Sequence, residues 1–413
     1  MDASKFQAVI RKIGFLKHYS SLLVPVAVTL IGALLFIPTQ LISNKLKERI
    51  KTESVSKGNQ IKELSKSSPA RNQWQVEQEY QVAFEQDANQ IALLSKQTSQ
   101  RPLLSYKIFP APKDTSTLIF EEFGQEFRKS LDRLIARVKG RDCPTDTELE
   151  RVLKSSGSQG GGRRFSKVSS SNLSDIDATI VDVFCKKTAE SASVYVNSSD
   201  LSGYNFWEAY TYVGMQDAVK DCWYWQLAYW ITEDVIDTIE TCNSGAKNVL
   251  TSPVKRLMGV SFSISSTGSS DRGKGAAGRP YYVLSTKDEL TGSCTGRLSN
   301  DAFDVVHFNV VVIVSAKAVL PFMKQLCSAK QHKSKGFSGD AKEQIFKHNQ
   351  ITILKSDILS VDMKDPKNEL YRYGEDAVVK LDLICEYIFN KNGYEQIKPE
   401  SVKESLKGET EKY

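Results

Sequence analysis

The stretch that decides the architecture reads Leu22-Leu23-Val24-Pro25-Val26-Ala27-Val28-Thr29-Leu30-Ile31-Gly32-Ala33-Leu34-Leu35-Phe36-Ile37. It is the centre of a longer run, Tyr19–Asn44, in which none of the 26 side chains is charged. A helix needs about 20 apolar residues to cross the hydrocarbon core of a bilayer. Because no second stretch of this kind follows, the sequence predicts one transmembrane helix over 19–42 that anchors one large soluble region.

A secretory signal peptide is the alternative interpretation of the same run. Signal peptides have a shorter apolar region and a small-residue cleavage site. Here the run is long, and Pro38-Thr39-Gln40 at its end is a poor cleavage site, so the sequence favours an uncleaved anchor.

The charges that flank the apolar run do not set the orientation of the predicted helix in the membrane. Four basic residues precede the run and four follow it, namely Lys5, Arg11, Lys12 and Lys17, then Lys45, Lys47, Arg49 and Lys51.

The composition of the chain is that of an ordinary globular protein. Of 413 residues, 40% are hydrophobic and 25% are charged, and the net charge is +6. No basic run with interleaved aromatic residues indicates a nucleic-acid surface. The seven cysteines include no Cys-x-x-Cys pair, so a zinc or redox motif is not expected. They are predicted to be small buried residues, although disulfides stay open for an extracytoplasmic domain.

A helical stalk is predicted over 43–100, directly after the anchor. Within it, Tyr80, Phe84, Ile91 and Leu94 follow 4, 7, 3 spacing, with Asp87 at the skipped position. That spacing is typical of a short coiled-coil seam. Two interpretations stay open, because the apolar stripe could pack against its own domain or pair with a helix of a partner subunit.

The first of two α+β blocks is predicted over 116–300. Leu118 to Val138 has the apolar periodicity of an amphipathic helix. An aromatic centre follows, in which alternation predicts a strand over 223–225, a helix from Leu227 to Ile239 and a strand over 257–264. More often than not, aromatic residues at such spacing form a core.

The second block is predicted over 301–392. Its centre is the unbroken run Val310-Val311-Val312-Ile313-Val314, which fits a strand buried on both faces. The remaining predictions are a helix over 317–329, a Lys-rich loop over 331–344, strands over 351–363 and 378–389, and a disordered tail over 393–413. The first strand of this pair has a predicted bulge near Lys355.

No motif in the chain points to catalysis. The segment 268–274 has the spacing of a phosphate-binding loop, but Gly275 stands where Ser or Thr should reach magnesium, and a strand follows instead of a helix. None of the histidines (His18, His307, His332 and His348) has a ligand partner at helical spacing. No serine lies in a Gly-x-Ser-x-Gly turn. Catalytic residues, a metal and a cofactor are therefore not expected.

The order of anchor, stalk and strand-helix-strand blocks resembles the bitopic inner-membrane proteins of type IV pilus and type II secretion machines, namely PilO and secretion protein M. The residues that carry the resemblance are the span 22–37, the stalk 41–94 and the blocks 223–264 and 307–389. The resemblance implies ferredoxin-like blocks, a cytoplasmic N-terminus over 1–18, and a periplasmic bulk attached to the bacterial inner membrane by a single pass. It also implies pairing with related subunits.

The expected function is therefore structural. The chain is expected to serve a pilus or secretion platform through homo- or hetero-oligomers, with contact to lipid but with no nucleic acid and no small-molecule substrate. The expected partner-binding surfaces are Tyr80, Phe84, Ile91 and Leu94 on the stalk, and a strand edge in the last block. The alternatives are a membrane-anchored ligand-binding or sensory module, with a cavity lined by Trp207, Trp223 and Trp230, and an anchored enzyme.

Overall fold

The computed structural model describes residues 20–67, 71–96, 101–156, 175–263, 278–336, 342–348 and 350–410. The chain forms two compact units, 1–89 and 90–413. The described part of the first unit is helical, and that of the second combines helices with a six-stranded mixed sheet and a two-stranded hairpin. The α+β class predicted from the sequence is therefore confirmed.

The helices of the N-terminal unit follow one another closely in the chain. They are α2 (Ser20–Arg49), the π-helical η2 (Ile50–Val55), α3 (Ser56–Ser67) and α4 (Arg71–Lys96), which continues past the unit boundary. The 30 residues of α2 extend over about 45 Å, more than the hydrocarbon thickness of a bilayer. By length and composition, the helical stretch Val24–Ser65 could cross a membrane, a test that a signal sequence near the N-terminus also passes.

The sheet of the second unit has the strand order β1-β2-β3-β4-β8-β7. The pairs β1–β2 and β2–β3 are parallel, whereas the three remaining pairs are antiparallel. The strands are β1 (Gly140–Arg141), β2 (Val194–Tyr195), β3 (Val254–Ser261), β4 (Phe303–Ser315), β7 (Ile351–Ser360) and β8 (Val378–Asn390). A separate hairpin contains β5 (Lys330–Ser334) and β6 (Gln344–His348).

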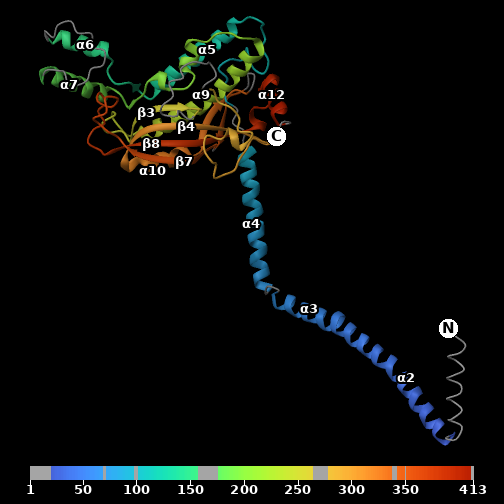
Figure 1. Cartoon of the computed structure of the whole chain (residues 1–413). Helices are drawn as coiled ribbons and strands as arrows, with labels where there is room; N and C mark the ends of the chain where they lie inside the picture. Colours follow the sequence, from blue (N-terminus) through green and yellow to red (C-terminus); the bar gives the residue numbers. More distant parts are fainter. Residues whose placement is uncertain are drawn as a thin grey trace, which may run out of the picture. The chain divides into compact units, whose positions relative to one another are not determined.

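Helices cover one face of this sheet, with α5 and α9 along it in Figure 1. Alternate residues of β4 and β8, such as Phe308 and Leu383, share one core with Trp223 and Ile231 of α9. Ile313 has the opposite parity on β4 and belongs to a smaller core on the other face. The helices are α5 (Leu118–Arg137), α6 (Asp146–Ser155), α7 (Asp175–Ser191), η4 (Ser198–Asp200), α8 (Tyr204–Glu208), α9 (Met215–Asn243), η5 (Thr286–Asp288), η6 (Ala316–Ala318), α10 (Val319–Leu326), α11 (Lys391–Tyr394) and α12 (Glu400–Thr410).

The strand predicted over 223–225 is wrong, because these residues lie inside helix α9. Trp223, Tyr224 and Trp225 are all buried, since α9 is packed between α5, α10, α12 and the sheet. Every residue of α9 from 222 to 228 is buried, so this part of the helix has no exposed polar face to reveal its period. Alternation within three aromatic residues therefore gave a false strand signal.

The two predicted ferredoxin-like blocks are also not separate. Strand β3 of the first block pairs with β4 of the second, for example Val260 with Val310, so both blocks contribute to one sheet. Within the shared sheet, β8 lies between β4 and β7 and pairs antiparallel with both, which is the strand order of a split β-α-β unit. Periodicity predicts that a strand exists, but it does not say which strand lies beside it.

Two segments that were predicted to be irregular have regular structure. The Lys-rich loop over 331–344 contains most of β5, in which Lys330, His332 and Ser334 alternate inward although all three are polar. The tail predicted to be disordered contains the end of α11 and all of α12, and its Val402 is fully buried. Its Lys398 is buried too and donates a 2.6 Å hydrogen bond to Asp304 of β4, which ties the tail to the sheet. The phosphate-loop-like segment 268–274 lies outside the described residues.

Candidate functional site

The predicted stalk seam lies on helix α4. Tyr80 and Phe84 are 70% and 75% exposed, and Val76 is half exposed. At about 100° of rotation per residue, these three positions share one narrow stripe of the helix. Ile91 and Leu94 fall on the same stripe of α4, although their side chains lie outside the described residues. The helix thus has an uncovered apolar seam within the part of the unit that is described.

Two further apolar side chains of α4 are exposed but lie off this stripe. Trp74 and Val82 are 58% and 50% exposed, and both are rotated by roughly 80° or more from the seam positions. They expose comparable apolar surface without extending the seam. Val82 in particular offers a matched control for any substitution at Phe84.

The strand edge predicted in the last block is β7. Within the described residues, β7 pairs with β8 on one side and with no strand on the other. Its last six residues, 355–360, are all exposed, including the apolar Ile358 and Leu359. The predicted bulge near Lys355 is confirmed by a register shift between Ile353 and Lys355. An open edge of this kind is a template for pairing with another strand.

The aromatic centre forms the core of the domain, as the sequence favoured. Trp207, Trp223 and Trp230 are all buried. The Trp223 ring stacks on Tyr394 at 5.6 Å between centroids, and its Nε1 donates a 2.8 Å hydrogen bond to the Tyr282 hydroxyl. Side chains of the same domain therefore occupy the space around Trp223.

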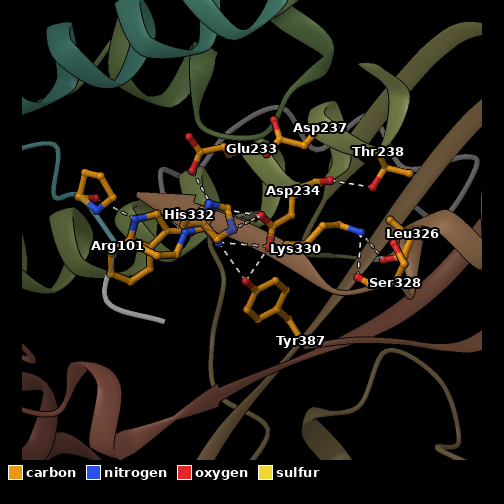
Figure 2. Close-up of polar contacts among 12 residues, drawn as sticks. Arg101, Glu233, Asp234, Asp237, Thr238, Leu326, Ser328, Lys330, His332 and Tyr387 are labelled. Carbon is orange, nitrogen blue, oxygen red and sulfur yellow. Dashed lines mark hydrogen bonds and ion pairs between the residues drawn. The ribbon is translucent and has the colours of Figure 1, made fainter. Parts of the chain in front are cut away.

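A buried ionic cluster, which the sequence did not predict, surrounds Asp234 of α9 (Figure 2). Both Asp234 carboxylate oxygens accept 3.1 Å hydrogen bonds from the Arg101 guanidinium. The Tyr387 hydroxyl of β8 donates to Asp234 at 2.7 Å, and Nε2 of His332 on β5 lies 2.8 Å from Oδ1. Arg101 also donates to Glu233 at 2.6 Å. We call these five residues the Asp234 cluster.

The Asp234 cluster was missed because its members are far apart in the sequence. Arg101 and Tyr387 are separated from Asp234 by 133 and 153 positions, and neither belongs to a spaced motif. The one local signal was the alternation of Lys330, His332 and Ser334, which indicates a strand. It went unrecognised because all three inward-facing residues are polar. The cluster residues come together only in the folded domain, where helix α9, strand β5 of the hairpin and strand β8 of the six-stranded sheet meet.

A metal ion is the first chemistry to test at this cluster, because atoms of Asp234, Asp237 and His332 lie within 4.8 Å of one another. A carboxylate has about four lone-pair sites, and those of Asp234 are taken by Arg101, Tyr387 and His332. A cation would have to displace the guanidinium. The cluster is therefore suited to holding the segment at Arg101 against the helix and the sheet, and not to binding a metal.

Burial sets the protonation chemistry around the cluster. It lowers the pKa of Lys330, whose Nζ donates 2.7 Å and 2.9 Å hydrogen bonds to the carbonyls of Gln325 and Leu326. It raises the pKa of the Tyr387 hydroxyl well above its usual range. Burial also raises the pKa of Asp237 to about 6, against a partial lowering by Arg137.

Asp237 should give the stability of the domain a pH dependence with a defined sign. In the unfolded chain this carboxyl titrates near its ordinary pKa of 3.8, whereas in the folded state it titrates near 6. Between these values only the folded state binds the proton, so lowering the pH from 6 to 4 stabilises the fold. Relative to D237N, the wild-type chain should lose at most about 3 kcal/mol as the pH rises through this window. Thermal unfolding of both chains from pH 4 to 8 measures the difference, and parallel curves would contradict it.

Other buried charges also have close partners. Asp304 of β4 lies 2.6 Å from Lys398 and accepts a hydrogen bond from Tyr394. Glu386 of β8 accepts a 2.9 Å hydrogen bond from Arg297 and a 3.0 Å hydrogen bond from Thr295. Each of these contacts ties a loop or the C-terminal segment to a central strand, which is a structural role.

A cleft of ≈ 1020 Å³ lies at the residues that follow β7 and precede β8. Its basic side chains are largely paired, because Arg372 lies 2.7 Å from Asp182 and Lys317 lies 2.9 Å from Asp376. The cleft therefore offers little uncompensated charge to an ionic ligand.

Comparisons of the chain with protein-family models, with curated proteins and with solved structures found no match.

Proposed function

We propose that this protein is a membrane-anchored assembly subunit without a catalytic role, whose stalk pairs with a helix of another subunit. The observation that carries the proposal is the apolar seam of α4, with Tyr80 and Phe84 more than two-thirds exposed. A helix of 26 residues gains most of its stability from packing of its apolar face. An uncovered seam on such a helix therefore favours a partner helix.

The anchor of the proposed subunit is helix α2. Its exposed side chains between Val24 and Phe36 are apolar or small, and the helix is longer than the hydrocarbon core. Such a surface is favourable in lipid and unfavourable in water. The order of anchor, stalk and α+β domain supports the type IV pilus or type II secretion platform of the bacterial inner membrane as the assembly, with the domain in the periplasm.

A ligand-binding module is the less well supported alternative. The three tryptophans expected to line its cavity belong to the domain core. The cleft near Arg372 has basic groups that already pair with Asp182 and Asp376. An anchored enzyme has even less support, since the polar groups of the Asp234 cluster are occupied by one another.

The anchor can be tested by placing charge in its centre. Leu30 and Leu34 are exposed on one face of α2, and a lysine at the centre of a spanning helix costs about 2.5–3.5 kcal/mol. The double variant L30K/L34K should move most of the chain from the membrane fraction to the soluble fraction. L64K is the matched control, because Leu64 is similarly exposed on α3 but lies outside the uncharged run.

Two results would contradict the anchor. One is a wild-type chain that is recovered in the soluble fraction at full length. The other is a mature chain whose mass shows that the apolar run has been removed, which would make it a signal sequence.

A further inference from the structure

The open edge of the sheet has a sequence that is complementary to itself. Around Ser356, strand β7 reads Ile353-Leu354-Lys355-Ser356-Asp357-Ile358-Leu359. Two apolar residues and one charge stand on each side of the serine, and the two charges have opposite sign. Read in the reverse direction, the segment keeps its apolar pattern and exchanges only the signs of its charges.

An antiparallel pair of two such strands would therefore place opposite charges beside the two-fold centre and apolar residues beyond them, with the bulge between Ile353 and Lys355 at each end of the matched segment. With Ser356 opposite Ser356 of a second copy, Lys355 faces Asp357, and the apolar residues on either side face one another. Opposite charges directly across an antiparallel pair each contribute about 0.2–1 kcal/mol, and like charges destabilise the pair. A shift by one residue would place Lys355 opposite Ile358, and a parallel arrangement in register would place Lys355 opposite Lys355.

The strand presents these residues in a form that can pair. Lys355 and Asp357 stand on the same face of the sheet, opposite Ile384 and Asp382 of β8, and lie 2.8 Å apart. Ile358 and Leu359 are 57% and 49% exposed and point to opposite faces. Charged residues on an edge strand normally prevent pairing. Here the charges alternate in sign about a two-fold centre, so they disfavour most partners and favour an identical one.

We propose that β7 pairs antiparallel with β7 of a second copy of this chain, with Ser356 at the two-fold centre, so that two six-stranded sheets become one continuous sheet. This homodimer goes beyond the proposed function, because it requires neither the anchor nor the stalk seam.

The register can be tested by disulfide crosslinking of the full-length chain in membranes, after the exposed Cys294 is replaced by serine. Residues directly opposite in an antiparallel pair have Cα atoms about 4.5–5.5 Å apart, which is within disulfide range. S356C should form a covalent dimer with itself. K355C and D357C should crosslink about tenfold less on their own, yet should crosslink with each other when the two chains are mixed. No S356C dimer, or equal crosslinking at all three positions, overturns the proposal.

A charge exchange provides a second test that does not depend on cysteine. K355D places an aspartate opposite Asp357 in both halves of the pair, and it should weaken the dimer about tenfold. The double variant K355D/D357K restores opposite charges across the two-fold centre and should recover the dimer. Unchanged association in K355D, or no recovery in the double variant, counts against the pairing.

The same crosslinking in an F84D/I91D background separates this inference from the stalk. If the S356C dimer persists there, β7 pairing is independent of the seam. If it disappears there but forms with the native seam, dimerisation is driven by the stalk, and the inference of an independent β7 homodimer is wrong.

Discussion

Replacing Asp234 by asparagine should lower the free energy of unfolding of the domain by about 3–5 kcal/mol, because it removes one partner of a buried ion pair. Arg101 is buried and would keep its charge, but it would lose the Asp234 carboxylate to which it donates two hydrogen bonds. The Tyr387 hydroxyl would lose an ionised acceptor at 2.7 Å. Chemical unfolding of the full-length chain, followed by the fluorescence of the buried tryptophans, measures the loss.

An exposed ion pair provides the control for this effect. Lys107 and Glu122 lie 2.8 Å apart, but both side chains are largely exposed, so E122Q should cost less than about 1 kcal/mol. The double variant R101M/D234L should recover much of the loss, since removing both partners leaves no buried charge of this pair without its counterion. Equal effects of D234N and E122Q would show that the cluster is not a structural centre.

Replacing Phe84 and Ile91 by aspartate should weaken association of the stalk at least a hundredfold without unfolding the domain. Burying a large apolar side chain contributes about 1.5–3 kcal/mol, and each tenfold in affinity corresponds to about 1.4 kcal/mol. Both positions lie on the seam stripe of α4, so both contributions would be lost together. Sedimentation of the detergent-solubilised chain, or crosslinking in membranes, measures the association.

V82D is the matched control for the stalk substitution. Val82 is exposed on the same helix but off the stripe, so its replacement should change the association less than about threefold. The domain should keep its unfolding transition in both variants. If F84D/I91D and V82D behave alike, the seam does not contact a partner.

Elements with a clear period could be read from the sequence. The helix predicted over 118–138 is α5, and the strand predicted over 378–389 is β8. Both have one apolar face and one polar face, which fixes their period. The bulge near Lys355 could also be predicted, because the apolar alternation slips by one residue there.

What could not be predicted depends on partners that are distant in the chain. Helix α9 is buried on every side over residues 222–228, so it shows no amphipathic period at its aromatic centre. Strand β5 is polar but buried, because its inward side chains meet α9 and the carbonyls at the end of α10. The Asp234 cluster joins Arg101 and Tyr387 to Asp234 across 133 and 153 positions, and no local pattern contains that information.

The position of Arg101 in the chain has a mechanical consequence. It follows the end of helix α4 at Lys96 by only five positions, and its guanidinium donates hydrogen bonds to Glu233, Asp234 and Tyr387. Any tension that passes along the polypeptide from its N-terminal side must reach this side chain before it reaches the sheet. Several hydrogen bonds would then be stretched together, and the domain would respond to a pull as one rigid body instead of peeling from its N-terminal end.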